Sequence, residues 1–536
     1  MRKLTPLLFC IVLLGSAGRA KADITPETCH RYLEMGQMNY SILVQTKDIV
    51  PDDPAPLVPR IQALEKKLAR DPEDLDVIDE LISLYGKDDR EKEAKSLAEE
   101  NLRYFIDRYR SRKDEKSALQ FSRIVSTLGK RELYNDAYTA LVPFLQKGRA
   151  AKETYVTAID NRMAAEDFTL AGRVADFALQ IYPEAAEIYF KKYQISFSGN
   201  IYTYISNLIQ ATQSQFLAEK DQATINAENA EQFLSLYIRN LRAGLDTESL
   251  ERALKLDPDN YRLNLNAAVI RILTHFFTTA WTKILTSDLD EEDIGSILHQ
   301  ADPQESKAIL ESLNRASVER PDRDIQVYLA YALYHFVFGE PEMVRNYAEL
   351  AMSTRPDLPQ GYDAVIFSSY LPLFGMEDPS YQETNRIVAR IIKEKMKNTG
   401  ENADDYFSLA GLSFSLYKES ALLKESASPE QGQLLADMKR YLEKSLELEE
   451  GNLPAMLGFG SYLILTGDYT GAIDHLESLR IRAPSDQIFL LLNNLGIAEV
   501  LAGDSQTGID DLKQALSLKK DNEKTIEALK ALGIEE

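Results

Sequence analysis

The chain has 536 residues, and its 84 acidic residues against 61 basic ones give a formal net charge of −23. A surface of this sign repels nucleic acid and anionic lipid, so we expect neither as a partner. Of its two cysteines, Cys10 and Cys29, the first lies in a segment that we expect to be removed, which excludes an internal disulfide and leaves stability to packing.

The N-terminus is typical of a secretory signal peptide. Two basic residues precede an apolar run at 7–14, and small residues follow it up to Ala22. Because this run is too short to remain as a membrane anchor, we predict cleavage after residues 1–22 and a soluble, exported, periplasmic chain that starts at Asp23. The later apolar stretch 264–285 is interrupted by charged residues and is predicted as a buried helix, so we expect no transmembrane segment.

After the signal peptide, the pattern divides the chain into four parts. Residues 23–47 carry apolar residues at helical spacing and are predicted as an N-terminal helical arm. Four prolines between 51 and 59 indicate an extended linker at 48–59. Helical periodicity then continues through 60–400, a region of degenerate repeats, and through the C-terminal repeats at 401–536.

One pattern occurs twice near the C-terminus, 36 residues apart. Gly460, Gly467, Leu476 and Leu479 recur as Gly496, Gly503, Leu512 and Ala515. A period of this length is typical of stacked helix pairs. Small residues at 460, 472, 496, 508 and 515 would let two helices cross closely, and the words Gly467-Asp468 and Gly503-Asp504 suit the turn within each pair.

A second phrase runs through the body, in which a small residue is followed five positions later by proline. It occurs at 178–183, 253–258, 316–321 and 351–356, in each case from alanine to proline. Together the two phrases resemble the tetratricopeptide repeat. The resemblance implies an all-α fold, a right-handed solenoid of stacked antiparallel helix pairs with irregular and inserted units.

The resemblance also implies a binding face, because tetratricopeptide arrays hold peptides or proteins on the inner face formed by the first helix of each unit. The matching positions here are Leu329, Leu333, Phe336, Leu457, Ser461, Ile464, Leu490, Asn493 and Ile497. The family's clamp for a C-terminal carboxylate needs basic residues, and only Asn493 or Asn494 would suit it. A mostly apolar face favours either an amphipathic helix of a partner or a fold-back of the N-terminal arm.

The sequence shows no catalytic motif, no metal-binding motif and no cofactor fingerprint, so we predict no catalytic residues, no metal and no cofactor. The basic cluster at 103–116 and the acidic run at 288–293 are both interpreted as features of solvated helix ends. We therefore predict a non-enzymatic scaffold for protein–protein contacts in cell-envelope assembly, secretion or maintenance. The alternative is a periplasmic glycan-processing hydrolase that uses acidic residues in a helical groove.

Overall fold

The structure is a computed structural model. It describes residues 24–26, 28–33, 35, 57–88, 90–199, 245–276, 303–319, 325–338, 340–373, 381–423, 429–480, 482, 487–520 and 522–534. These residues belong to two compact units. The first unit contains the described residues between 57 and 354, and the second contains those between 24 and 35 together with those from 355 onward.

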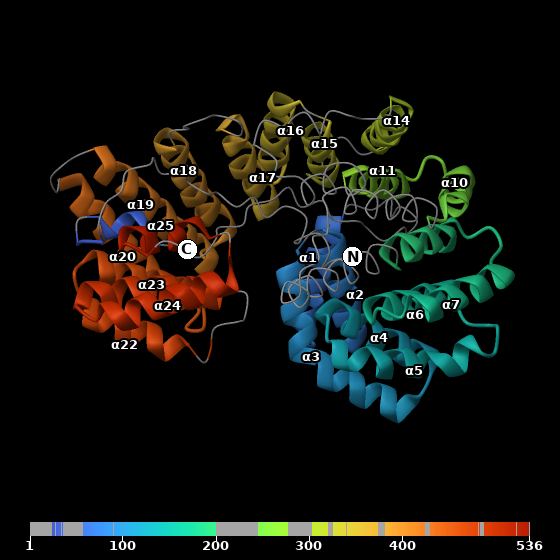
Figure 1. The fold of residues 1–536 in the computed structure, drawn as a ribbon. Helices are drawn as coiled ribbons and strands as arrows, with labels where there is room; N and C mark the ends of the chain where they lie inside the picture. Colours follow the sequence, from blue (N-terminus) through green and yellow to red (C-terminus); the bar gives the residue numbers. More distant parts are fainter. Residues whose placement is uncertain are drawn as a thin grey trace, which may run out of the picture. The chain divides into compact units, whose positions relative to one another are not determined.

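The described residues of the first unit form helices and the turns between them (Figure 1). In addition to a helical stretch at 186–199, they are α1 (Leu57–Leu68), α2 (Leu75–Lys87), α3 (Glu91–Arg112), α4 (Glu115–Leu128), the 3₁₀ turn η2 (Arg131–Leu133), α5 (Tyr134–Leu145), α6 (Lys152–Ala164), α7 (Phe168–Ile181), α10 (Thr247–Leu256), α11 (Tyr261–Phe276), α14 (Pro303–Glu319), α15 (Ile325–Val337) and α16 (Pro341–Thr354).

The second unit also consists of helices and adds one short N-terminal element. Its elements are η1 (Cys29–Arg31), α17 (Pro359–Tyr370), η4 (Leu371–Leu373), α18 (Gln382–Thr399), α19 (Ala403–Leu423), α20 (Pro429–Leu448), α21 (Leu453–Leu465), α22 (Tyr469–Leu479), α23 (Ile488–Ala502), α24 (Ser505–Leu518) and α25 (Glu523–Ala531). Successive helices pack as antiparallel pairs, most extensively α19 with α20 and α23 with α24. The described residues contain no strand, which confirms the predicted all-α class of stacked helix pairs.

The predicted turn within each C-terminal pair is confirmed by its backbone. Gly467 and Gly503 have φ angles of 84° and 98°, values that an L side chain rarely adopts and that end a helix. Asp468 and Asp504 follow, and each accepts a hydrogen bond from a main-chain N–H three residues later, at Gly471 and Thr507. The aspartates therefore cap α22 and α24, whose first residues lie 36 positions apart.

Close helix crossing at the predicted glycines is also confirmed. A Cβ atom on Gly496 would lie 2.6 Å from the carbonyl oxygen of Gly508, and one on Gly508 would lie 2.5 Å from that of Gly496. Only glycine lets the backbones of α23 and α24 approach so closely. Gly460 has a different neighbour, because a Cβ there would overlap the side chain of Leu476 on α22.

One sequence boundary needs correction, and a second region is described only in part. The proline-rich stretch 48–59 was expected to be extended throughout, but α1 already begins at Leu57. Pro59 lies in its first turn, where the missing N–H would have no partner within the helix. The arm 23–47 was expected to be helical. Its described part, up to residue 35, contains the short turn η1, and the rest lies outside the described residues. Just before η1, Thr28 accepts a hydrogen bond from the N–H of Thr25, a local contact that competes with an α-helix.

Several predictions fall outside the described residues. They include the signal peptide at 1–22, the rest of the arm from 36 to 47 and the acidic run at 288–293. The apolar stretch 264–285 is described up to Phe276, where it forms the largely buried helix α11. Across the described ranges, no helix has the length and apolar character that a bilayer crossing needs.

Candidate functional site

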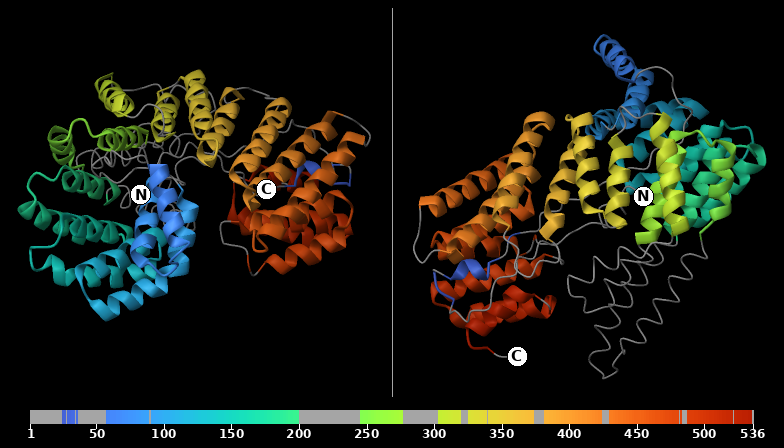
Figure 2. Two further views of the ribbon diagram at one scale, coloured as in Figure 1. Left: turned by 180° about the vertical axis from the view of Figure 1, so that it is seen from behind. Right: turned by 90° about the horizontal axis from the view of Figure 1, so that it is seen from above.

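An N-terminal segment, residues 24–35, packs onto the helices of the C-terminal unit. Two views show it beside the C-terminal helices, as the isolated blue piece among the orange and red ones (Figures 1 and 2). The turn η1 contacts α21. Cys29, His30, Tyr32 and Leu33 of the segment are buried, with exposures of 1%, 4%, 4% and 0%. The segment is therefore an integral part of this unit's core, although more than 300 residues separate it from α17.

The main chain of this segment is held by a buried amide network on α23. Asn493 Nδ2 donates to the carbonyl oxygen of Tyr32 at 2.9 Å, and Asn493 Oδ1 accepts from Thr525 Oγ1 of α25 at 2.9 Å. Asn493 Nδ2 also lies 3.2 Å from Asn494 Oδ1, and Asn494 Nδ2 donates to Ser461 Oγ of α21 at 2.9 Å. This network fixes the orientation of both amides, so the Asn493 donor is directed at a peptide carbonyl.

The side chains of the segment fill spaces between the repeat helices. Met35 Cε lies 2.7 Å from the position that a Cβ on Gly458 would occupy, so this glycine on α21 makes room for the methionine. The ring of His30 meets that of Tyr417 edge to face, with centroids 6.2 Å apart. Burial, together with the nearby Cys29, raises the pKa of Tyr417 above its ordinary value. Cys29 itself is buried and donates to the carbonyl oxygen of Pro26 at 3.3 Å.

The structure brings five of the predicted face residues together in this unit. Leu457 and Ser461 lie on α21, and Leu490, Asn493 and Ile497 lie on α23, with exposures between 0% and 8%. Ile464 on α21 is also buried. The sequence left open whether this face is free or is covered by the chain itself. These positions are buried, and Asn493 among them contacts Tyr32 of the N-terminal segment.

The other three predicted positions lie on α15 in the first unit. Leu329 and Leu333 are buried, and Phe336 is half-buried. Helix α15 packs against α11, α14 and α16. A hydrogen bond also links α15 to α14, because Tyr331 Oη donates to Asn314 Oδ1 at 2.7 Å. Both leucines therefore lie within the packed helices of their own unit.

The basic cluster at 103–116 pairs with acids of the same unit. Arg108 and Lys116 lie 2.8 and 2.7 Å from the carboxylate of Asp76 on α2. Arg103 lies 4.0 Å from Asp107, one helical turn away on α3. These contacts support the interpretation of the cluster as part of a solvated helix surface, rather than as a patch for polyanions.

A group of three carboxylates was missed by the sequence analysis. Glu477, Glu499 and Asp511 lie on α22, α23 and α24, and oxygens of all three lie within 4.8 Å of one another. Arg480 Nη1 contacts Glu477 Oε1 at 2.8 Å, and Arg480 Nη2 contacts Asp511 Oδ1 at 3.1 Å. Burial, and then the negative charges of Asp511, Asp504 and Glu477, raise the pKa of Glu499 to about 7. No motif signals this group, because each helix contributes one acid.

Comparisons with known proteins were made against families, curated proteins and solved structures. No family model matches the chain, and no curated protein does. Among solved structures, it is similar to YrrB, described as a tetratricopeptide repeat protein with an unusual peptide-binding site. The two are 17% identical with a TM-score of 0.29, and the match covers 41% of this chain and 97% of YrrB.

Two further solved structures are similar to this chain. A tetratricopeptide repeat protein from Parabacteroides merdae is 13% identical with a TM-score of 0.32, over 57% of this chain and 98% of that protein. Human IFIT1, solved as a dimer with PPP-AAAA, is 11% identical with a TM-score of 0.29, over 88% and 97%. Because all three TM-scores are below 0.5, the fold is assigned from the helices themselves. Stacked antiparallel pairs with a 36-residue step make it tetratricopeptide-like.

Proposed function

We propose that this chain is an exported, non-enzymatic scaffold whose C-terminal helix pairs bind an extended protein segment. We propose further that it mediates protein–protein contacts in the assembly, secretion or maintenance of the cell envelope. The observation that carries the proposal is the hydrogen bond from the buried Asn493 amide to the main-chain carbonyl oxygen of Tyr32. A side-chain donor aimed at a peptide carbonyl recognises main chain, whatever the sequence of the bound segment.

Apolar contacts supply the second part of the recognition. Leu457, Leu490 and Ile497 give the face its apolar character, and the absence of a side chain at Gly458 leaves room for Met35. Residues 24–35 are the resident occupant of this face. A partner segment would compete with them, so we expect it to be a peptide with closely spaced aromatic and apolar side chains. The net charge of −23 argues against nucleic acid in that role.

Export is supported by the sequence of residues 1–22, in which basic residues, a short apolar run and small residues follow one another. Mass spectrometry of the exported protein should give Asp23 as the first residue, whereas an intact Met1 or a lipid on Cys10 would contradict the proposed processing.

Binding can be tested by displacing the resident segment. In the Leu33→Glu variant, a carboxylate replaces a side chain that is 0% exposed, so the segment should leave the groove. A labelled synthetic peptide of residues 23–36 should then bind this variant in trans. Its affinity for the wild-type protein should be at least ~10-fold weaker, because the tethered segment is present at a high effective concentration.

Two further variants make this test specific. Adding Asn493→Ala to the displaced variant should weaken peptide binding about 10-fold, as expected for loss of one buried hydrogen-bond donor. Leu518→Glu is the matched control, because Leu518 is 47% exposed on α24 and a charge there should leave the protein like wild type. Equal binding of the peptide to all variants would contradict the proposed groove.

The partner and the enzymatic alternative are separated by a second experiment. Envelope extract should supply a protein that the Leu33→Glu variant retains more strongly than wild type and that the peptide 23–36 displaces. Turnover of a cell-wall glycan that depends on a single acid of this chain would favour the hydrolase instead.

A further inference from the structure

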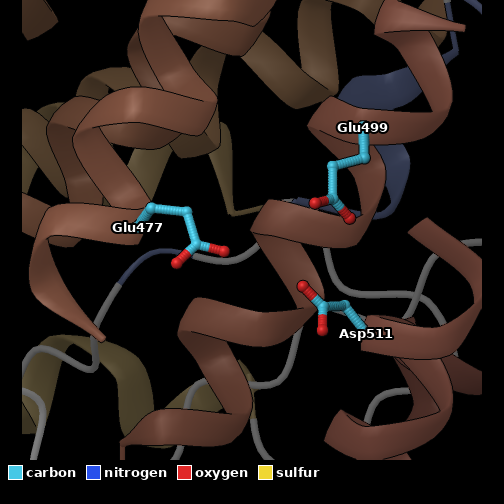
Figure 3. A group of neighbouring side chains, drawn as sticks. All are labelled: Glu477, Glu499 and Asp511. Carbon is cyan, nitrogen blue, oxygen red and sulfur yellow. The ribbon is translucent and has the colours of Figure 1, made fainter. Parts of the chain in front are cut away.

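Three carboxylates converge where α22, α23 and α24 meet. Figure 3 shows the side chains of Glu477, Glu499 and Asp511 turned toward one another from three different helices. Each offers an oxygen that lies within 4.8 Å of the oxygens of the other two. Such proximity of like charges needs a compensating cation or proton.

Two of these carboxylates are buried with an oxygen that no group satisfies. Glu499 and Asp511 are each 6% exposed. Within the part of the chain that the structure describes, Glu499 Oε2 and Asp511 Oδ2 are buried and have no hydrogen-bond partner. Buried polar atoms are almost always partnered, and an unpaired buried charge is costly. The orphaned oxygens therefore point to a ligand.

We propose that Glu477, Glu499 and Asp511 form a binding site for one divalent cation of the size of Ca²⁺. Charge is the first argument. The three ionised carboxylates carry three negative charges, and Arg480 offsets one of them through its contacts with Glu477 and Asp511. Two negative charges remain, which one divalent cation balances.

Size and ligand type are the second argument. Oxygen is the ligand that hard cations prefer, and Ca²⁺ bonds of about 2.3 to 2.6 Å reach across oxygens that lie within 4.8 Å of one another. Magnesium demands near-octahedral geometry with bonds of about 2.0 to 2.1 Å, whereas Ca²⁺ accepts flexible geometry. Glu477 is on the exposed side of the group, with 42% of its side chain accessible, so an ion and its remaining water ligands can enter there.

The test uses the full mature chain freed of metal by a chelator and then dialysed at pH 8. Titration with Ca²⁺ in a calorimeter should show one saturable site, and Ca²⁺ at ten times its Kd should raise Tm by about 3 °C or more. Glu499→Gln should abolish the binding with no loss of fold, because it keeps the side-chain shape. Glu477→Gln, at an exposed position, should weaken it about 10-fold.

The control is Glu443→Gln on α20, an exposed acid of the same unit that pairs with Lys439 at 3.6 Å. It should bind Ca²⁺ as wild type does. The proposal is overturned if wild type shows no saturable Ca²⁺ binding at millimolar concentration and pH 8, or if Glu499→Gln binds as tightly as wild type. If Mg²⁺ and Ca²⁺ raised Tm equally, charge screening would explain the increase, and the proposed Ca²⁺ site would also be overturned.

Discussion

Helix α23 carries two buried polar side chains, Asn493 and Glu499, that differ in how fully they are hydrogen-bonded. Asn493 is 0% exposed, and both polar atoms of its side chain are hydrogen-bonded, to Tyr32, Thr525 and Asn494. Glu499, less than two turns further along, is 6% exposed and has an oxygen without a partner among the described residues. Both sites are buried, but only the first is satisfied.

This difference distinguishes a polar group that only holds the structure from one whose state can change with pH or bound ions. A neutral amide whose partners are all present contributes specificity and does not change with pH or ions. A buried carboxylate near other carboxylates is poised to take up a proton or a cation, because either relieves its charge. One face of α23 is therefore suited to holding a chain segment, and the other to sensing solution conditions.

The largest loss of stability is expected from a substitution at Gly496, which lies between Asn493 and Glu499 on α23. Gly496→Leu would place a Cβ 2.6 Å from a main-chain oxygen of Gly508, which no side-chain motion can relieve. Overpacking of this kind should cost about 3 kcal/mol and disturb both side chains together. Denaturant unfolding gives the comparison with Ser505→Ala, an exposed position at the start of α24, which should cost under about 0.5 kcal/mol. Equal costs would contradict the proposed helix contact.

This glycine also shows how much of the fold the sequence could predict. The 36-residue step predicted the turn glycines, the capping aspartates and the crossing at Gly496, because each depends on residues close in sequence or on a repeated pattern. The predicted end of the linker at residue 59 was wrong. The number of prolines suggested an extended chain through Pro59, but α1 already begins at Leu57, because a first helical turn tolerates proline.

The candidate site was less predictable for a physical reason. Asn493 was selected as an inward position of a repeat, but its partner Tyr32 lies 461 residues away and contributes a main-chain atom, which leaves no trace in side-chain patterns. The carboxylate group is similar, because Glu477, Glu499 and Asp511 lie on three helices at spacings that match no metal motif. Only packing of the pairs brings them together.

The pH dependence of stability tests the responsive side of α23. The pKa of Glu499 rises from an ordinary 4.5 to about 7 in the folded state, so the folded chain holds this proton more tightly than the unfolded chain. Stability from this group is greatest below pH 4.5, decreases as pH rises to about 7, and is constant above. In chelator, the loss should be roughly 3 kcal/mol.

Glu499→Gln should remove this decrease of the unfolding free energy with rising pH. The variant should therefore be more stable than wild type at pH 8 and similar to it near pH 4.5. Denaturant unfolding at a series of pH values measures the difference, and Glu443→Gln should retain the wild-type slope. A slope that persists in Glu499→Gln would assign the titration to other groups.

Removing the satisfied amide should have a smaller effect on stability. Asn493→Ala deletes the donor to Tyr32 and the acceptor for Thr525, and should cost about 2 kcal/mol at every pH. The matched control is Gln506→Ala on α24, which removes an exposed amide that donates to Asp510 and should cost little. A pH-dependent cost of Asn493→Ala would show that Asn493 and Glu499 are coupled.

The smallest effect is expected at Ser461, which supports the network through Asn494. Its Oγ accepts from Asn494 at 2.9 Å, and Asn494 in turn contacts Asn493, so Ser461 helps to orient the donor. Ser461→Ala should cost about 1 kcal/mol in denaturant unfolding. Combined with Leu33→Glu, it should weaken binding of the peptide 23–36 only a few-fold, less than Asn493→Ala does. A loss as large as that of Asn493→Ala would place Ser461 in direct contact with the peptide, whereas no loss at all would mean that Asn493 keeps its orientation through Thr525 alone.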